Sequence, residues 1–469
     1  MLVPKSADER PHLRRHIWRI IRRRPWTVGI ALVLGLILWW VTISFSLIAL
    51  IFPPPEATTR ISAHTGFETW AQIRRTPQNS ASTPDQGPQT PVELRWTYNT
   101  SGPILAGPAV VAGRIYITTG DGRALALERD TGQPVWEFPT IVPSDTSPAI
   151  AGDLLFFGLR NKRFVALDRE TGELRWEKDL GNPVLASPIV ADGTVYIGST
   201  NRQLYALDAA TGQERWTLTV GGWIVAPVAY RDDRVAVASQ DGLLHIVEAK
   251  TGRIRFVYDA GWPIMGAPTI HEDRVLVVSH RGTVWSLDWN SSTYPLERLW
   301  WAARVNLFVW GLLPSVPSQQ GAIWASSVGD SVALSPATAH NAVYVASSGG
   351  KVVSLDIGTG SERWATKLDQ KITAGPIVTG NTLLVGSEDG ILYALDPFTG
   401  KEEWNFKTGG KISASPVVVG DMLYVASHDG NLYALSSKLD FVRSSGAGEG
   451  IDKLGMQIGN GFFPVIVGH

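Results

Sequence analysis

Short apolar runs alternate with polar turns along most of the chain, and they fall into groups of four. In the best-preserved group, a proline-led run at 188–190 is followed by runs at 194–198 and 204–207, and then by a run that carries Trp216. Each run is about five residues long, rich in β-branched or aromatic residues, and bounded by turn residues, as short strands usually are. Each group therefore predicts four antiparallel strands joined by tight turns.

The groups recur at a fixed interval. Trp96, Trp136, Trp176 and Trp216 are spaced forty residues apart, and the series resumes later in the chain. A fixed period of this length indicates stacked copies of one supersecondary unit. Asp-Gly and Thr-Gly dipeptides recur between the runs and suit tight turns that need positive φ.

The number of units follows from two counts. Eight runs begin with a proline: Pro108, Pro148, Pro188, Pro227, Pro268, Pro336, Pro376 and Pro416. Seven units end on an aromatic residue: Trp136, Trp176, Trp216, Phe256, Trp301 (or Trp300), Trp364 and Trp404. The eighth unit lacks one, but an orphan strand over 92–98 carries Trp96 in phase. Ring closure removes open sheet edges, so we predict an all-β, eight-bladed β-propeller over 91–438, with four-stranded antiparallel blades and the N-terminal strand completing the last one.

The pattern breaks once, between Trp301 and Pro336, where an insertion spans 302–330. A smaller one lies at 289–299, and we expect both between blades five and six. Loops that outgrow a rigid scaffold often carry function. Docking of a partner protein and filling of the central channel are equally favoured for this insertion, and plain decoration of the scaffold is the less favoured alternative. Its candidate docking residues are Leu307, Phe308, Trp310, Leu312 and Leu313.

Residues 26–52 contain no charged side chain. As a helix at ~1.5 Å per residue they would span roughly 40 Å, more than the ~30 Å hydrocarbon core of a bilayer. Residues 1–25 hold eight basic and two acidic side chains, which favours a cytoplasmic N-terminus. We expect a basic cytoplasmic head over 1–25, one uncleaved transmembrane helix over 26–52, and an extracytoplasmic propeller. A cleaved signal peptide is disfavoured because its apolar core is only ~7–15 residues.

Two flanking segments lack the repeat. Residues 53–90 are rich in Pro, Ser and Thr, and we interpret them as a linker, part extended and part flexible, that lifts the propeller off the bilayer. Within it, 67–75 is a candidate for a short ordered stretch packed on the domain. The tail over 439–469 contains seven glycines, and its apolar run at 462–467 is a candidate strand.

Composition excludes several classes of protein. The chain has 42 Lys and Arg against 43 Asp and Glu, and without the basic head its body is mildly acidic, which disfavours nucleic acid as a partner. There is no cysteine, which rules out disulfides, thiolate metal sites, a cysteine nucleophile and a lipidated N-terminal cysteine. No phosphate-binding loop, Gly-x-Ser-x-Gly motif or zinc-spaced histidine pair stands out. His271, Glu272 and Asp273 fall in an expected turn, so a metal site there is disfavoured.

The string Leu-Tyr-Ala-Leu-Asp-x-x-Thr-Gly-x-x-x-Trp occurs at 204–216 and again at 392–404. It resembles the repeat of the pyrroloquinoline quinone (PQQ)-type propellers. The resemblance implies that the closing aromatic residue of each blade packs against the neighbouring blade. The residues expected in that role are Trp96, Trp136, Trp176, Trp216, Phe256, Trp301, Trp364 and Trp404.

The resembled family contains quinoprotein dehydrogenases, which bind the quinone and a calcium ion near the propeller axis, and a non-catalytic, BamB-like branch that binds other envelope proteins. This chain lacks the vicinal cysteine pair of the soluble dehydrogenases, and no residue matches their calcium ligands or catalytic aspartate. The resemblance therefore implies a scaffold without catalysis or cofactor, held at the cell membrane by 26–52 in place of a lipidated cysteine. The alternatives are a PQQ- and calcium-dependent dehydrogenase and a sensor that binds a small ligand in the channel.

Overall fold

The computed structural model describes residues 33–35, 53–63, 69–293, 297–314, 317, 319–438, 440–443, 454–458 and 461–464. The chain divides into two units, Met1–Pro53 and Pro54–His469. In the first unit, residues 33–35 are helical; the basic head and the rest of the predicted transmembrane segment lie outside the described residues. Across the described ranges, no helix is both long enough and apolar enough to cross a membrane.

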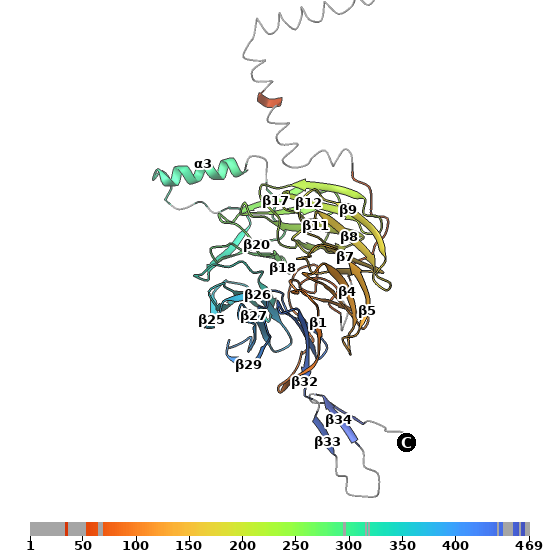
Figure 1. Cartoon of the computed structure of the whole chain (residues 1–469). Helices are drawn as coiled ribbons and strands as arrows, with labels where there is room; N and C mark the ends of the chain where they lie inside the picture. Colours follow the sequence, from red (N-terminus) through yellow and green to blue (C-terminus); the bar gives the residue numbers. More distant parts are fainter. Residues whose placement is uncertain are drawn as a thin grey trace, which may run out of the picture. The chain divides into compact units, whose positions relative to one another are not determined.

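The second unit contains eight four-stranded antiparallel sheets that follow one another in sequence, which confirms the predicted eight-bladed propeller (Figure 1). In the first blade the strands lie side by side in chain order: β2 (Ala109–Val111), β3 (Arg114–Thr118), β4 (Arg123–Glu128) and β5 (Pro134–Pro139).

Six further blades repeat this order. Blade two has β6 (Ala149–Ala151), β7 (Leu154–Gly158), β8 (Arg163–Asp168) and β9 (Leu174–Asp179). Blade three has β10 (Ile189–Ala191), β11 (Thr194–Gly198), β12 (Gln203–Asp208) and β13 (Glu214–Thr219). Blade four has β14 (Ala229–Arg231), β15 (Arg234–Ala238), β16 (Leu243–Glu248) and β17 (Ile254–Asp259). Blade five has β18 (Thr269–His271), β19 (Arg274–Val278), β20 (Thr283–Asp288) and β21 (Ala322–Ser327). Blade six has β22 (Ala337–Ala339), β23 (Ala342–Ala346), β24 (Lys351–Asp356) and β25 (Glu362–Lys367). Blade seven has β26 (Ile372–Val378), β27 (Leu383–Ser387), β28 (Ile391–Leu395) and β29 (Glu402–Lys407).

The eighth blade closes the ring. It combines β30 (Val417–Val419), β31 (Met422–Ala426) and β32 (Asn431–Ser437) with β1 (Val92–Asn99) from the start of the propeller. The antiparallel register runs from Val92 opposite Ser437 to Asn99 opposite Asn431. Figure 1 shows β1 lying beside β32, although the two are at opposite ends of the colour scale. The predicted closure by the N-terminal strand is therefore confirmed.

Burial explains the sequence pattern of each blade. The inner strand is short and almost wholly buried, as in β2, whereas the outer strand alternates, as in β5. The apolar core lies between neighbouring blades: one cluster joins Ile189, Tyr196 and Leu204 of blade three to Val235 and Val247 of blade four. Stacked sheets bury both of their faces, which is why the middle strands are continuous apolar runs.

The ring has two faces, set by strand direction. The turns between strands one and two, and the connections between strands three and four, lie at one end of every blade. Thr58 is bound to blade three at that end, and we call it the Thr58 face. The turns between strands two and three and the connections between blades lie at the other end, which we call the cavity face.

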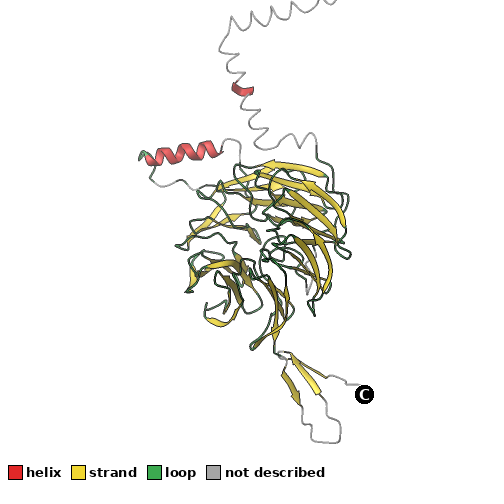
Figure 2. Cartoon of the chain, in the orientation of Figure 1, coloured by secondary structure: helices red, strands yellow, loops and turns green. Residues whose placement is uncertain are grey.

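The insertion does not lie where the sequence predicted. The fourth strand of blade five is β21, so the extra chain runs over 289–321, between strands three and four of that blade. The predicted boundaries 302–330 and the predicted place between blades five and six are wrong. The error arose because β21 lacks a preceding Thr-Gly turn, so that its Trp324 was not recognised. The insertion contains α3 (Glu297–Val309), the long helix in Figure 2.

The predicted linker is also wrong over most of its described length. Residues 69–87, which we call the inner segment, run inside the ring, and several of their side chains are fully buried. They form hydrogen bonds with each of the eight blades in turn, from blade one to blade eight. The pairs are Trp70 with Val110, Ala71 with Ile150, Gln72 with Val190, Pro77 with Tyr230, Gln78 with Ile270, Ser80 with Thr338, Ala81 with Val378, and Gly87 with Gly420. The expectation of ordered packing around 67–75 is confirmed for its described part.

The tail forms a separate three-stranded sheet of β33 (Asp440–Arg443), β34 (Leu454–Ile458) and β35 (Gly461–Pro464). Neighbouring strands pair antiparallel. The strand expected within 462–467 therefore exists in part, as β35.

Candidate functional site at the ring axis and on the two faces

Tryptophans at the outer strands tie each blade to the next. Each indole N–H donates to a backbone carbonyl in the following blade, at 2.8–3.2 Å: Trp96 to Arg129, Trp136 to Arg169, Trp176 to Ala209, Trp216 to Ala249, Trp324 to Ile357, and Trp364 to Pro397. One such hydrogen bond contributes about 1 kcal/mol to the free energy of unfolding. Burial of the indole ring against the next blade stabilises the fold further.

The Thr-Gly turns have a packing role beyond their turn chemistry. The glycine of each turn lies directly on the indole of the preceding blade; a Cβ at Gly212 would stand 2.6 Å from the Trp176 ring, and one at Gly252 would stand 2.7 Å from Trp216. Both glycines also have positive φ. Only glycine meets both demands at once, so the Thr-Gly repeat and the tryptophan repeat encode the same joint.

Three predicted joint residues differ from the others. Phe256 is buried against Gly321 of blade five, but its ring has no N–H to donate. Trp404 packs with Val92 and Tyr433 against the core between blades seven and eight, where the chain ends replace the glycine turn. Trp301 was assigned wrongly: it lies on α3 and donates to the Pro317 carbonyl, and Trp324 occupies the joint position.

The inner segment closes the central channel. Trp70 is only 2 % exposed. Asn79 is fully buried, and its Nδ2 donates to the carbonyls of Val228, at 2.8 Å, and Pro268, at 3.1 Å. Arg74 and Asn79 are both left-handed, with φ near 57°. The inner segment is thus bent by unusual backbone conformations that its contacts with the ring hold in place.

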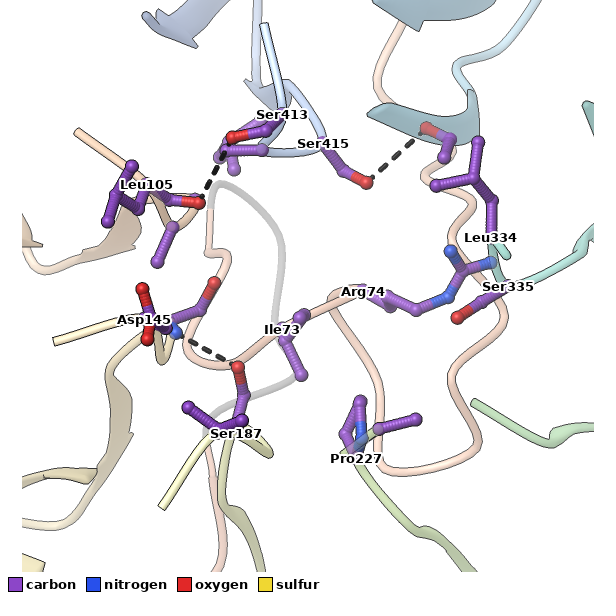
Figure 3. A pocket seen from close by; sticks show the side chains of 18 of the residues that line it. Ile73, Arg74, Leu105, Asp145, Ser187, Pro227, Leu334, Ser335, Ser413 and Ser415 are labelled. Atoms are coloured by element: carbon purple, nitrogen blue, oxygen red, sulfur yellow. Dashed lines mark hydrogen bonds between the residues drawn. The ribbon is translucent and has the colours of Figure 1, made fainter. Parts of the chain in front are cut away.

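A cavity of about 260 Å³ lies on the axis of the ring, between the inner segment and the cavity face. Its floor contains Trp70, Ile73 and Arg74, and its wall comes from the connections that precede the inner strands of the blades. Those connections belong to the cavity face. Figure 3 shows Ile73 and Arg74 of the floor between Ser413 and Ser415 on one side and Ser187 and Asp145 on the other.

The serines of the wall hold neighbouring blades together. Ser187 Oγ accepts from the Ser147 amide at 2.9 Å, and Ser335 Oγ accepts from the Ala267 amide at 2.7 Å. Ser415 Oγ donates to the Gly375 carbonyl at 3.3 Å. These hydroxyls act in the ring structure, so their presence on the wall is not by itself a sign of catalysis.

Arg74 is the charged group of the floor. Its Nε donates to the Asn79 carbonyl at 3.2 Å, and its Nη2 donates to the Pro336 carbonyl. No described carboxylate forms an ion pair with it, and burial lowers the pKa of its guanidinium to about 9. A buried cation held by carbonyls alone favours an anion nearby. Arg74 lies outside the repeat, so no sequence pattern pointed to this position.

The acidic and nucleophilic groups of the cavity are few. Asp145 is the single carboxylate of the lining, and both its oxygens accept from Arg160 at 2.6 Å. Ser413 Oγ lies 2.6 Å from Nε2 of His428, whose pKa is lowered by burial and by Lys411. Within the described part of the chain, no carboxylate is hydrogen-bonded to His428, so the orienting group of a hydrolytic triad is missing.

The lining does not fit a calcium-bound quinone. Calcium takes six to eight oxygen ligands in proteins, usually with several carboxylates. The lining offers one carboxylate, which Arg160 already occupies. No group of three or more histidine, aspartate or glutamate residues suited to a metal ion occurs in the described ranges.

The predicted docking residues lie at the C-terminal end of α3 and just beyond it. Trp310 is 71 % exposed and Leu312 is 67 % exposed, while Leu307, Phe308 and Leu313 are half-buried. Because α3 leaves blade five between strands three and four, it belongs to the Thr58 face.

Sequence reasoning did not single out two exposed tryptophans on the cavity face. Trp223 and Trp262 occupy the connections before blades four and five and are 52 % and 45 % exposed. The Arg281 guanidinium lies 3.7 Å from the centre of the Trp262 ring. The signal was available, because the two tryptophans fall one repeat apart.

Comparison with known proteins agrees with the fold. The family model described as "Outer membrane protein assembly factor BamB" matches residues 90–183, 140–222, 207–371 and 348–440. No curated protein matches the chain by sequence.

Among solved structures, BamB from Moraxella catarrhalis is 19 % identical, with a TM-score of 0.61, over 74 % of this chain and 97 % of that one. A europium-containing methanol dehydrogenase is 13 % identical, with a TM-score of 0.66, over 78 % and 98 %. The quinohemoprotein alcohol dehydrogenase from Comamonas testosteroni is 14 % identical, with a TM-score of 0.63, over 82 % and 83 %. At these identities the likeness shows the shared propeller fold alone.

Proposed function

The chain belongs to the family of the outer membrane protein assembly factor BamB, and from this premise we propose that it is a membrane-anchored, extracytoplasmic propeller that binds other envelope proteins as a scaffold. The proposal rests mainly on what occupies the central axis of the ring. The inner segment closes the channel, and the one carboxylate of the remaining cavity is held by Arg160. The ring thus presents loops for binding rather than a catalytic centre.

The anchor in this proposal is residues 26–52. Their uncharged composition and the basic head before them support a single membrane crossing with the N-terminus in the cytoplasm. The propeller then lies outside the cytoplasm. The given sequence contains no cysteine, so the proposal assigns the attachment to 26–52 rather than to a lipidated cysteine.

The surface proposed for protein partners is the cavity face around Trp223 and Trp262. Tryptophan and arginine are the residues that most often dominate binding energy at protein interfaces, and Arg281 already stacks on Trp262. These two tryptophans lie at the end of the ring opposite Thr58. A partner would therefore meet them without displacing the tether.

Photo-cross-linking in intact cells tests the scaffold. A photoreactive amino acid at position 223 or 262 should give adducts with other membrane or envelope proteins. The matched control is position 398, because Phe398 is 58 % exposed on the Thr58 face. Equal adducts from both faces, or none from the cavity face, would contradict the proposed partner surface.

The dehydrogenase alternative makes a different prediction. The full chain in detergent should then bind pyrroloquinoline quinone with calcium and reduce an electron-accepting dye with alcohols or sugars. We expect neither binding nor turnover, because the lining supplies one occupied carboxylate. Turnover in this assay would replace the scaffold with an enzyme.

A small anionic ligand in the cavity is the second candidate, and it is favoured by one observation: the buried Arg74 has no carboxylate partner among the described residues. Under this candidate, the chain senses a ligand through its cavity. Titration with phosphate and citrate should then raise the melting temperature of the chain. A flat titration removes this candidate and leaves the scaffold unaffected.

A further inference from the structure

The segment around Thr58, which precedes the propeller strands, is fastened to one face of the ring. The Thr58 amide donates to Asp208 at 2.6 Å, and the Thr58 hydroxyl donates to the same carboxylate at 2.8 Å. Nearby, the Gly193 amide donates to Ile61, and Arg215 Nε donates to Pro55. Asp208 ends the third strand of its blade and Gly193 lies in a turn between strands one and two, so all these contacts belong to the Thr58 face.

The insertion leaves the ring on this same face, because it connects the third and fourth strands of blade five. Its helix α3 has 13 residues, which corresponds to roughly 20 Å of helix. The helix ends in a group of exposed apolar side chains. Val309 is 69 % exposed, and Trp310 and Leu312 are exposed to a similar degree.

The tether between the proposed anchor and this face is short. Residue 52 ends the uncharged stretch, and Thr58 is already bound to Asp208. Six residue steps reach no more than roughly 20 Å even when fully extended. A bilayer crossed by 26–52 therefore lies within about one α3 length of the attachment point on the Thr58 face.

From these observations we infer that the end of α3, Val309, Trp310 and Leu312, inserts into the interfacial layer of the same bilayer and fixes the Thr58 face toward the membrane. Tryptophan with aliphatic neighbours is the composition typical of membrane interfaces. Interfacial helices bury their apolar side chains about 5–10 Å into the boundary between headgroups and acyl chains. The inference rests on the proposed anchor at 26–52.

Apolar burial, rather than charge, drives this contact. The turns of the Thr58 face carry acidic residues together with basic ones, and two of the acidic residues are paired, Asp232 with Arg231 and Asp233 with Lys250. Such a mixed surface gains little from anionic lipid. Insertion should therefore be as deep in purely zwitterionic bilayers as in mixed ones, and it should resist added salt.

Nitroxide labels on the full chain in phosphatidylcholine nanodiscs test the inference. The chain has no cysteine, so each substitution creates a single labelling site. Trp310→Cys reports on the end of α3, and Ile141→Cys, at a strongly exposed position of the cavity face, is the matched control. We expect several-fold fewer collisions with a water-soluble nickel chelate, and more with oxygen, at position 310 than at 141.

Two outcomes overturn the inference. One is equal access of the nickel chelate to positions 310 and 141. The other is a label at 310 that neither nickel nor oxygen reaches, which would indicate contact with a second copy of the chain or another protein. A third site, Leu38→Cys, separates the two levels of the proposal. Lipid contact at 38 with an aqueous 310 refutes only the α3 inference, whereas an aqueous 38 refutes the anchor itself.

Discussion

The inner segment, 69–87, and the insertion, 289–321, both lie outside the regular repeat, but only the inner segment is buried in the ring. The inner segment is bound to all eight blades in turn and is buried along most of its length. The insertion forms a helix whose end is among the most exposed apolar regions of the propeller. The central channel is therefore filled by the segment that forms hydrogen bonds with the inner strands. The insertion is longer and has more exposed apolar side chains, but it does not fill the channel.

The physical reason lies in the backbone groups at the axis. Inner strands have three residues in most blades, and their free edges face the channel. Buried amide and carbonyl groups need partners. The inner segment supplies partners one blade at a time, whereas α3 pairs most of its backbone groups within the helix and leaves only those of its ends.

Paired tryptophan substitutions should show the largest contrast between the two regions. Trp70→Ala removes a side chain that is 2 % exposed, and it should lower the free energy of unfolding by about 3–5 kcal/mol. Trp310→Ala on the exposed end of α3 should change it by less than about 0.5 kcal/mol. Urea unfolding of the two variants measures both values. Similar losses would mean that the inner segment is not part of the core.

A second pair locates the border of the insertion. Trp324→Ala removes an indole that donates to the Ile357 carbonyl at 2.9 Å and packs on Gly360. We expect the free energy of unfolding to fall by about 2–3 kcal/mol. Trp301→Ala, within α3, should cost less than about 1 kcal/mol. If Trp301→Ala lowered the free energy of unfolding more than Trp324→Ala, then Trp301 would be the residue that joins blades five and six, as predicted from the sequence.

A third pair compares two amide side chains that donate to backbone carbonyls. Asn79→Ala leaves the carbonyls of Val228 and Pro268 without their donor inside the ring, and it should cost about 1–3 kcal/mol. Asn306 donates to Ala302 on the exposed surface of α3, so Asn306→Ala should stay within about 0.5 kcal/mol of the parent chain. Thermal unfolding of both variants checks the contrast, and equal shifts would count against burial of the inner segment.

The smallest effect concerns pH and the attachment at Thr58. Burial acts to raise the pKa of Asp208, but hydrogen bonds from Thr58 and Thr211 outweigh it and leave the pKa below its usual value. The attachment is therefore complete above the unfolded value of about 3.9 and weakens as the pH falls through the lower folded value. A spin label at Glu56→Cys should become more mobile below about pH 4.

Two controls sharpen this pH prediction. Asp208→Asn should remove the pH response at position 56, since the titrating group is gone. A label at Trp310→Cys should show no comparable change, because the end of α3 does not depend on that carboxylate. A label at 56 that stays immobile through this range would contradict the role assigned to Asp208.

The repeat made most of the fold predictable, and its interruptions marked the limits of prediction. The eight proline-led runs and the in-phase Trp96 sufficed for the blade number and the closure by β1, because the same strand pattern recurs in every blade. The course of 69–87 through the ring was not predictable, although an ordered stretch packed on the domain was expected over 67–75. Its proline-, serine- and threonine-rich surroundings match a flexible linker, and its burial depends on eight partners far away in sequence.

The candidate site was predictable only in part. The exposed apolar end of α3 was visible in the order of residues around Trp310. Arg74 was not, because a single arginine outside the repeat has no distinctive spacing, and its burial is a consequence of the ring. Trp324 was missed for two local reasons. The turn before it is Gln320-Gly321 rather than Thr-Gly, and Trp300 and Trp301 lie closer to the position that the forty-residue period indicates.

Amide hydrogen exchange on the full chain tests the central claim most directly. The amides of Trp70 and Thr83 donate to Val110 and Val378 of the inner strands, so they should exchange as slowly as those strands and open only with the ring. The amides of α3 should exchange orders of magnitude faster. Exchange at 70–83 as rapid as that of α3 would contradict the claim that the ring is closed around its own N-terminal segment.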